Sequence, residues 1–116
     1  MPATNISVVI PLFNEEESIG ELFQWIKSTL DKENLSFEVI FVNDGSKDKS
    51  WEIIEGLCSN HVEARGICFR RNYGKSAALN TGFEVTKGEV VITMDADLQD
   101  SPEEIPEMYE MIKEGN

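Results

Sequence analysis

The sequence has few cysteines and a single histidine. Cys58 and Cys68 are the two cysteines among 116 residues, and both stand in apolar segments with no histidine at a metal-binding spacing. A disulfide framework and a cysteine-based zinc site are therefore excluded. We expect both thiols to be buried and reduced, as in a cytosolic protein. His61 stands alone in a predicted loop and is assigned no role.

Positive charge is scarce as well. Lys and Arg number 10 against 22 Asp and Glu, which gives a net charge of −12. This balance repels phosphate backbones and anionic lipid surfaces, and no basic stripe relieves it, so nucleic acid is excluded as a partner. An anionic ligand can still bind where a metal ion, a helix N-terminus or a few local cations offset the charge.

Long apolar runs are also missing. No segment approaches the roughly 20 apolar residues that cross a bilayer, and Met1–Asn5 lacks the basic and apolar regions of a secretory signal. We therefore expect this chain to be cytoplasmic.

Apolar residues nevertheless make up 41% of the chain, enough for the core of one domain over residues 1–116. Strands are expected at residues 6–12, 37–42, 64–69 and from residue 90, the first ending near Pro11. A segment with helical spacing follows each strand. The order βαβαβαβα predicts an α/β fold, with a Rossmann-like, mostly parallel sheet and helices on both faces.

The most informative stretch is residues 90–100, VVITMDADLQD. Its β-branched start predicts a central strand buried on both faces, and its end delivers Asp95 and Asp97 to the carboxyl edge of the sheet. Side chains two apart on an extended chain point the same way, so we expect these carboxylates to converge on one ligand. Carboxylate oxygens suit Mg²⁺ or Mn²⁺, and the stretch therefore predicts a divalent metal at a strand end.

A solvated turn or a helix cap is the alternative interpretation of these acids. Ser101, Pro102 and Glu104 fit a capping box with proline at the first helical position. That arrangement explains Ser101 and the neighbouring Asp100, but it leaves Asp95 and Asp97 unexplained.

Two other predicted strands also end in polar residues, at 13–15 and 43–46. Because parallel strands end at a common edge, we expect these clusters to meet the acidic pair there, as in a nucleotide site. The sequence contains neither G-x-G-x-x-G after the first strand nor a P-loop motif, so classical NAD binding and P-loop hydrolysis are excluded. A diphosphate at this edge would instead be held by a metal.

Several polar residues keep two interpretations at this point. Glu15–Glu17 can complement the dipole of the helix that follows, which is favoured for Glu16 and Glu17. Asp44 is either a turn residue or a ligand contact. The basic cluster of Arg70, Arg71 and Lys75 is either a set of phosphate partners or a solvated loop.

Taken together and in order, five motifs resemble the successive signatures of family 2 glycosyltransferases, and most of all the polyprenyl- and dolichyl-phosphate sugar transferases. They are VIPLFNE (9–15), VNDGSKD (42–48), RNYGK (71–75), ALNTG (78–82) and DADLQD (95–100).

This resemblance implies the N-terminal half of a GT-A fold and an inverting transfer of sugar from a UDP- or GDP-sugar, with Mg²⁺ or Mn²⁺ as cofactor. The acceptor is expected to be a polyprenyl (lipid) phosphate, with the longer protein at the cytoplasmic face of a membrane. The implied nucleotide-binding residues are Pro11, Phe13, Glu15, Val42, Asp44, Lys75 and Asp95; the implied metal ligands are Asp95, Asp97 and Gln99, and Asp97 handles the metal and diphosphate in catalysis.

The sequence departs from the family pattern in three respects. Phe13 replaces a frequent tyrosine, Asn43 replaces the first of two frequent aspartates, and family members continue beyond Asn116 into the acceptor site and catalytic base. We therefore expect a chain truncated at its C-terminus, whose exposed sheet edge favours self-association. Two alternative functions stay open: a nucleotide- and metal-binding fragment without transferase activity, and a metal-dependent phosphohydrolase or nucleotidyltransferase.

Overall fold

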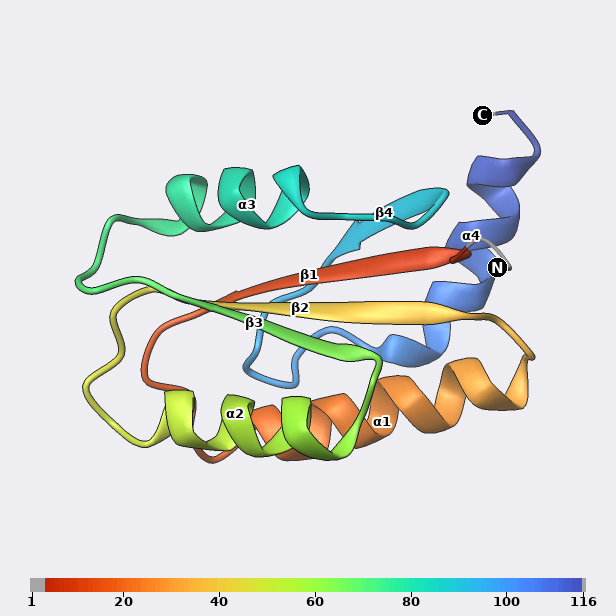
Figure 1. Cartoon of the computed structure of the whole chain (residues 1–116). Helices are drawn as coiled ribbons and strands as arrows, with labels where there is room; N and C mark the ends of the chain where they lie inside the picture. Colours follow the sequence, from red (N-terminus) through yellow and green to blue (C-terminus); the bar gives the residue numbers. More distant parts are fainter. Residues whose placement is uncertain (1–3, 116) are drawn as a thin grey trace.

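The computed structural model describes residues 4–115. These residues form a sheet of four parallel strands with helices on both faces (Figure 1). The elements are β1 (Ile6–Leu12), α1 (Ile19–Lys32), β2 (Phe37–Asn43), α2 (Ser50–Asn60), β3 (Ala64–Cys68), α3 (Lys75–Glu84), β4 (Val90–Thr93), the 3₁₀ helix η1 (Pro102–Glu104) and α4 (Ile105–Lys113). The predicted α/β alternation is confirmed. None of the described helices is long and apolar enough to cross a membrane.

The strand order is β3-β2-β1-β4, so the chain builds the sheet in one direction from β1 and then crosses back to add β4 on the other side. A crevice forms at such a reversal, beyond the carboxyl ends of the strands, because the loops on either side leave in opposite directions. Here the reversal lies between β1 and β4, which pair from Ile6 with Val90 to Val9 with Thr93.

Pro11 lies inside β1 rather than at its end, since β1 pairs with β2 as far as Leu12 and Asn43. Backbone groups of alternate residues point to alternate neighbours, and the Val9 carbonyl accepts from Met94 N–H on the β4 side. The missing N–H of Pro11 therefore faces β4 just where the β1–β4 pairing stops, and it costs the sheet no hydrogen bond.

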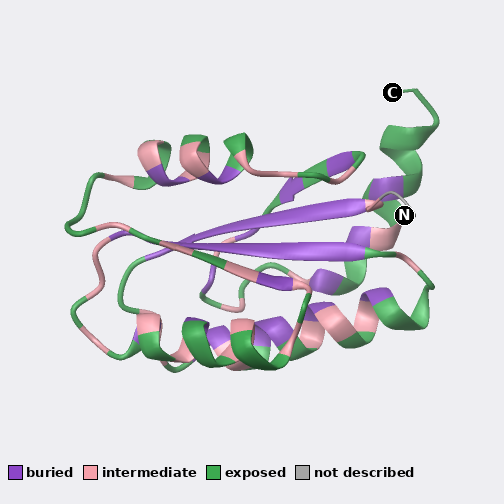
Figure 2. Ribbon diagram, viewed as in Figure 1, coloured by how far each residue is buried: buried purple, intermediate pink, exposed green. Residues whose placement is uncertain are grey.

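Two apolar layers enclose the sheet. On one face α1, α2 and α4 cover a large core that includes Phe23, Phe41 and Ile105, and on the other α3 covers a small core around Val9 and Ala78. β1 and β2 are buried along their whole length (Figure 2). The two inner strands thus form a rigid platform, and their carboxyl ends hold the loops of the site.

The structure corrects the prediction that residues from 90 form a central strand. β4 is an edge strand of the described sheet, and its burial alternates: Val90 and Ile92 are buried, whereas Val91 and Thr93 are exposed. The reason is that α3 packs over β1 and β2, leaving one face of β4 uncovered in the described residues.

The burial of α4 and of the two cysteines does not follow from residue type alone. In α4, Ile105 and Tyr109 point inward, but the apolar residues Met108, Met111 and Ile112 are exposed. The short helix follows η1 and meets the protein along one narrow stripe. The expectation that both thiols are buried was wrong: Cys58 is half-buried, and Cys68 is exposed at the end of edge strand β3.

A polar cluster that local periodicity did not predict lies at the amino end of the sheet, beneath α3. The Glu38 carboxylate accepts from Ser7 Oγ at 2.6 Å, from Lys87 N–H at 2.6 Å and from Arg65 Nη1 at 2.7 Å. Arg65 also donates to the Val85 carbonyl. Burial alone would raise the pKa of Glu38, but these hydrogen bonds and the Arg65 charge hold it below its ordinary value. The cluster clamps the α3–β4 connection onto the sheet.

Candidate functional site

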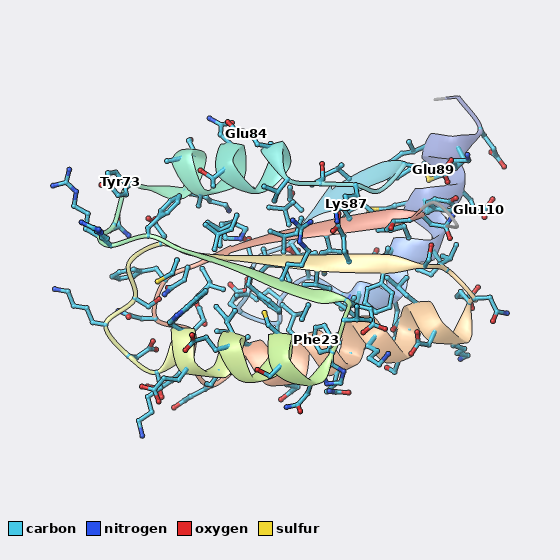
Figure 3. The ribbon with its side chains drawn as sticks, in the orientation of Figure 1. Phe23, Tyr73, Glu84, Lys87, Glu89 and Glu110 are labelled. Atoms are coloured by element: carbon cyan, nitrogen blue, oxygen red, sulfur yellow. The ribbon has the colours of Figure 1, made fainter. Side chains whose placement is uncertain are left out.

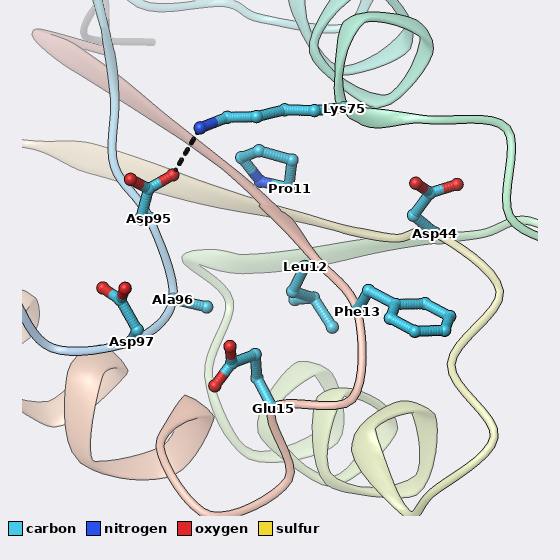
Figure 4. A pocket seen from close by; sticks show the side chains of 9 residues that line it. All are labelled: Pro11, Leu12, Phe13, Glu15, Asp44, Lys75, Asp95, Ala96 and Asp97. Atoms are coloured by element: carbon cyan, nitrogen blue, oxygen red, sulfur yellow. Dashed lines mark hydrogen bonds and ion pairs between the residues drawn. The ribbon is translucent and has the colours of Figure 1, made fainter.

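A cleft of about 260 Å³ opens at the carboxyl ends of β1, β2 and β4 (Figure 4). Its walls come from the three polar strand ends, which the structure brings together as the sequence suggested. The lining residues are Pro11, Leu12, Phe13, Glu15, Asp44, Lys75, Asp95, Ala96 and Asp97. An exposed aromatic ring thus stands on one side of the cleft and two aspartates on the other.

Asp95 and Lys75 form an ion pair across one end of the cleft. Lys75 Nζ lies 2.7 Å from Asp95 Oδ1, and the two side chains are 63% and 50% exposed. The hydrogen bond and charge of Asp95, followed by the charges of Asp100 and Asp97, raise the pKa of Lys75 above its ordinary value. The ammonium group is therefore charged and faces three carboxylates.

The loop that carries the two aspartates is closed by its own acids. Asp100 accepts from the backbone N–H of Asp95 at 3.2 Å, and Asp97 accepts from the N–H of Gln99 at 3.2 Å. Leu98, between them, has φ of +66°, a strained value for a bulky residue. Strain of this kind persists only where the surroundings enforce it, and here it holds Asp97 at the cleft.

Ser18 connects this loop to the start of α1. Its hydroxyl donates to the Ala96 carbonyl, between the two aspartates, and lies 3.2 Å from Glu15 Oε2. Ser18 occupies the N-cap position of α1, yet its side chain makes no capping hydrogen bond. A serine just before a helix normally caps it, but here the hydroxyl supports the aspartate loop instead.

Asp44 fixes the opposite wall. It is 5% exposed, and its carboxylate accepts from the backbone N–H groups of Tyr73 at 2.7 Å and Gly74 at 3.0 Å. Beside it Gly45 has φ of +75°, and a Cβ there would lie 2.3 Å from the Arg71 carbonyl carbon. Only glycine permits this approach, which joins the β2–α2 loop to the β3–α3 loop.

The loops after β1 and β2 are also joined. Asn14 N–H donates to Ser46 Oγ at 2.8 Å, and Asn14 Oδ1 accepts from Lys47 N–H at 2.8 Å. Asp48 accepts from Glu16 N–H and Ser50 N–H; burial opposes ionisation, but these bonds lower the pKa of Asp48. The two loops behave as one unit beneath Phe13.

This geometry changes the interpretation of Glu16 and Glu17. Because α1 begins at Ile19, both residues lie in the preceding turn, and Glu21 is the acid of the first helical turn. Glu15 lines the cleft instead, which leaves its carboxylate available to a ligand.

Four other candidate residues do not line the cleft: Val42, Gln99, Arg70 and Arg71. Val42 is fully buried in the small core beneath α3, with Val9 and Ala78. The Gln99 side chain is exposed on the aspartate loop. In the basic cluster Arg71 stacks on the Tyr73 ring, 4.9 Å from its centroid, so only Lys75 of that cluster reaches the cleft.

The chain was compared with known proteins. The model of the family described as Glycosyl transferase family 2 matches residues 7–116. An undecaprenyl-phosphate 4-deoxy-4-formamido-L-arabinose transferase of Aeromonas hydrophila is 44% identical over 95% of this chain, and an uncharacterized glycosyltransferase, YkcC, of Bacillus subtilis is 42% identical over 94%. The chain spans about a third of the length of these relatives, 34% in each case.

Solved structures agree. S. aureus TarS (residues 1–349) in complex with UDP-GlcNAc matches with a TM-score of 0.75 and 26% identity, over 96% of this chain and 32% of that one. The Pyrobaculum calidifontis mannosyltransferase PcManGT in complex with GDP-Man and Mn²⁺ matches with a TM-score of 0.67 and 26% identity, over 84% of this chain and 28% of that one. The fold is that of GT-A glycosyltransferases, and the chain belongs to glycosyltransferase family 2.

Proposed function

We propose that this protein binds a UDP- or GDP-sugar with a divalent cation and, within its full length, transfers the sugar to a polyprenyl phosphate with inversion. The observation that carries the proposal is the cleft itself. An exposed aromatic ring, a buried aspartate, a lysine, the half-exposed Asp95 and the exposed Asp97 line one cavity at the reversal of strand order.

The nucleoside would occupy the Phe13 side of the cleft. The Phe13 ring is 42% exposed and offers a stacking face to a base. Asp44 already accepts two backbone N–H groups, but an ionised carboxylate has acceptor sites for about four hydrogen bonds. It can therefore also accept from a base N–H. Glu15 lies on the same β1–α1 loop, and Val42 supports this wall from below by packing.

The diphosphate and cation would occupy the other side. Asp95 and Asp97 supply hard carboxylate oxygens, the ligand type that Mg²⁺ and Mn²⁺ prefer. Among residues 4–115 no three His, Cys, Asp or Glu side chains converge as a ready-made metal site, so the diphosphate oxygens would complete the coordination. We assign Gln99 to this end through its bond with Asp97, and Lys75 to a phosphate oxygen.

The chemistry required here is stabilisation of a leaving nucleoside diphosphate. A bound cation neutralises the negative charge that develops on the diphosphate as the sugar departs. Asp97 would bind the cation, and Lys75 would supply a second positive charge. A polyprenyl phosphate acceptor is already ionised, so its attack on the opposite face of the sugar needs no general base. The names of the relatives support such an acceptor, and we assign the reaction to the cytoplasmic face of a membrane.

Calorimetric titration tests the donor site. UDP, GDP and their sugar conjugates are titrated with and without Mn²⁺ into the wild type, Asp97→Asn and the control Asp31→Asn, an exposed aspartate on α1. We expect Mn²⁺-dependent binding of one nucleotide, weakened about 100-fold by Asp97→Asn because a charged contact is worth about 3 kcal/mol, and unchanged in the control. Binding that is equally tight without a metal would contradict the proposal.

Two assays separate the alternatives. Release of inorganic phosphate from simple phosphoesters would favour the phosphohydrolase. Nucleotide binding by this chain, without sugar transfer to undecaprenyl phosphate even in a longer form of the protein, would favour a binding function alone.

A further inference from the structure

The cation side of the cleft already holds a positive charge, the Lys75 ammonium, on the carboxylate assigned above to a divalent metal. Its Nζ lies 2.7 Å from Asp95 Oδ1 (Figure 4), so a metal ion on this carboxylate would lie close to a second positive charge while the pair is intact. Building on the proposed function, we infer that Lys75 is the resting counter-ion of Asp95 and moves to the sugar donor's diphosphate when a divalent cation binds.

The attachment of Lys75 allows such a movement. Its backbone is fixed, because Lys75 opens α3 and the preceding Gly74 N–H is held by Asp44. Its side chain is 63% exposed and extends over the cleft from α3. A four-carbon stem on a fixed base lets the ammonium swing between two acceptors without any change in the fold.

The ion pair is weak enough to be exchanged. Exposed lysine–carboxylate pairs contribute little stability because water and salt screen them. A divalent ion brings twice the charge and binds Asp95 directly, and a diphosphate offers Lys75 several oxygens, so the exchange replaces one weak pair by two stronger contacts.

The surrounding charge couples the two movements. The charged groups around Lys75 are the carboxylates of Asp95, Asp97 and Asp100. If Lys75 left alone, these carboxylates would repel one another without compensation. A divalent cation removes that repulsion and the diphosphate receives the lysine, so each ligand favours the other by the same factor.

The decisive measurement is the affinity for Mn²⁺ alone, from the electron paramagnetic resonance signal of free Mn²⁺, repeated with saturating UDP or GDP. We expect Lys75→Met to bind Mn²⁺ alone about fivefold more tightly, because an exposed pair of up to about 1 kcal/mol no longer competes. The nucleotide should then improve Mn²⁺ affinity much less than in the wild type. Lys75→Arg keeps a positive charge beside Asp95 and should show no such gain in affinity for Mn²⁺ alone.

The control Lys32→Met removes an equal charge from the last turn of α1 and should change neither affinity. If Lys75→Met binds Mn²⁺ alone no more tightly than the wild type, while both still bind nucleotide with metal, the exchange is refuted and the proposed function stands. If the wild type binds neither Mn²⁺ nor nucleotide, both are refuted.

Discussion

The two ends of the sheet carry acidic side chains in opposite conditions. At the amino end Glu38 is 6% exposed and its oxygens accept from Ser7, Arg65 and the Lys87 backbone. At the carboxyl end Asp95 is half exposed with one lysine partner. Figure 3 shows Lys87 toward the first end and Tyr73 at the other.

The difference separates structural from functional acids. A buried carboxylate that accepts several hydrogen bonds inside the protein holds elements together and is not exposed to a ligand. Carboxylates gathered at a cleft with few protein partners repel one another, and a cation beside them reduces that cost. Whether an acidic residue at a strand end holds the fold together or is available to a ligand therefore depends on the partners that the fold gives it.

The largest expected effect comes from disrupting the Glu38 cluster at the amino end of the sheet. Glu38→Ala leaves Arg65 and the Lys87 N–H without their partner, and should lower the free energy of unfolding by about 3 kcal/mol. Urea denaturation measures the loss. Glu38→Gln keeps the shape and part of the hydrogen bonding, so it should cost less. An equal cost for both would mean that charge alone matters there.

Asp97→Asn should show the reverse pattern. It should weaken metal-dependent nucleotide binding about 100-fold. It should change the free energy of unfolding by no more than about 0.5 kcal/mol, because Asp97 is exposed and its neutralisation relieves repulsion between like charges. Denaturation beside the titration checks this. A large loss of stability would place Asp97 in the same class as Glu38.

Ser18→Ala lies between the two extremes. It leaves the buried Ala96 carbonyl without its hydroxyl partner, which should cost about 1–2 kcal/mol of stability. The loosened aspartate loop should also weaken Mn²⁺-dependent nucleotide binding several-fold. Ser18→Thr keeps the hydroxyl and should restore the binding; if it does not, the bond to Ala96 does not position the aspartates.

The smallest effect is a dependence on pH. The pKa of Glu38 is lower in the folded protein than in the unfolded chain. Its contribution is therefore complete above the ordinary pKa of a glutamate and is lost as the pH falls through the lower, folded value. Urea midpoints measured from pH 7 to pH 3 should fall less steeply in Glu38→Gln than in the wild type, since Asp48 and Glu63 still contribute in both.

The sequence predicted the alternation of elements and the meeting of three polar strand ends, because both follow from local periodicity and parallel topology. It did not predict the Glu38 cluster, whose partners Ser7, Arg65 and Lys87 lie 31, 27 and 49 residues away. Long-range partners leave no periodic signal. For the same reason Ser18 reads locally as a helix cap, although the fold uses it elsewhere.

Sequence periodicity also could not predict the order of the strands in the sheet. The run from Val90 looks like a strand buried on both sides, but Val91 is 40% exposed because β4 lies at the edge of the described sheet. In α4, Met108 and Ile112 follow helical spacing correctly, and only the position of the helix decides that they face outward.

Pro11 lines the cleft at the point where the pairing of β1 with β4 stops. β1 and β4 are paired as far as Val9 and Thr93. The next residue of β1 that faces β4 is Pro11, which has no N–H to continue the pairing. Pairing in a parallel sheet advances two residues at a time, about 6.6 Å along the strand. A residue with an N–H at position 11 would therefore allow the pairing to extend by one such step, which would make the cleft shallower.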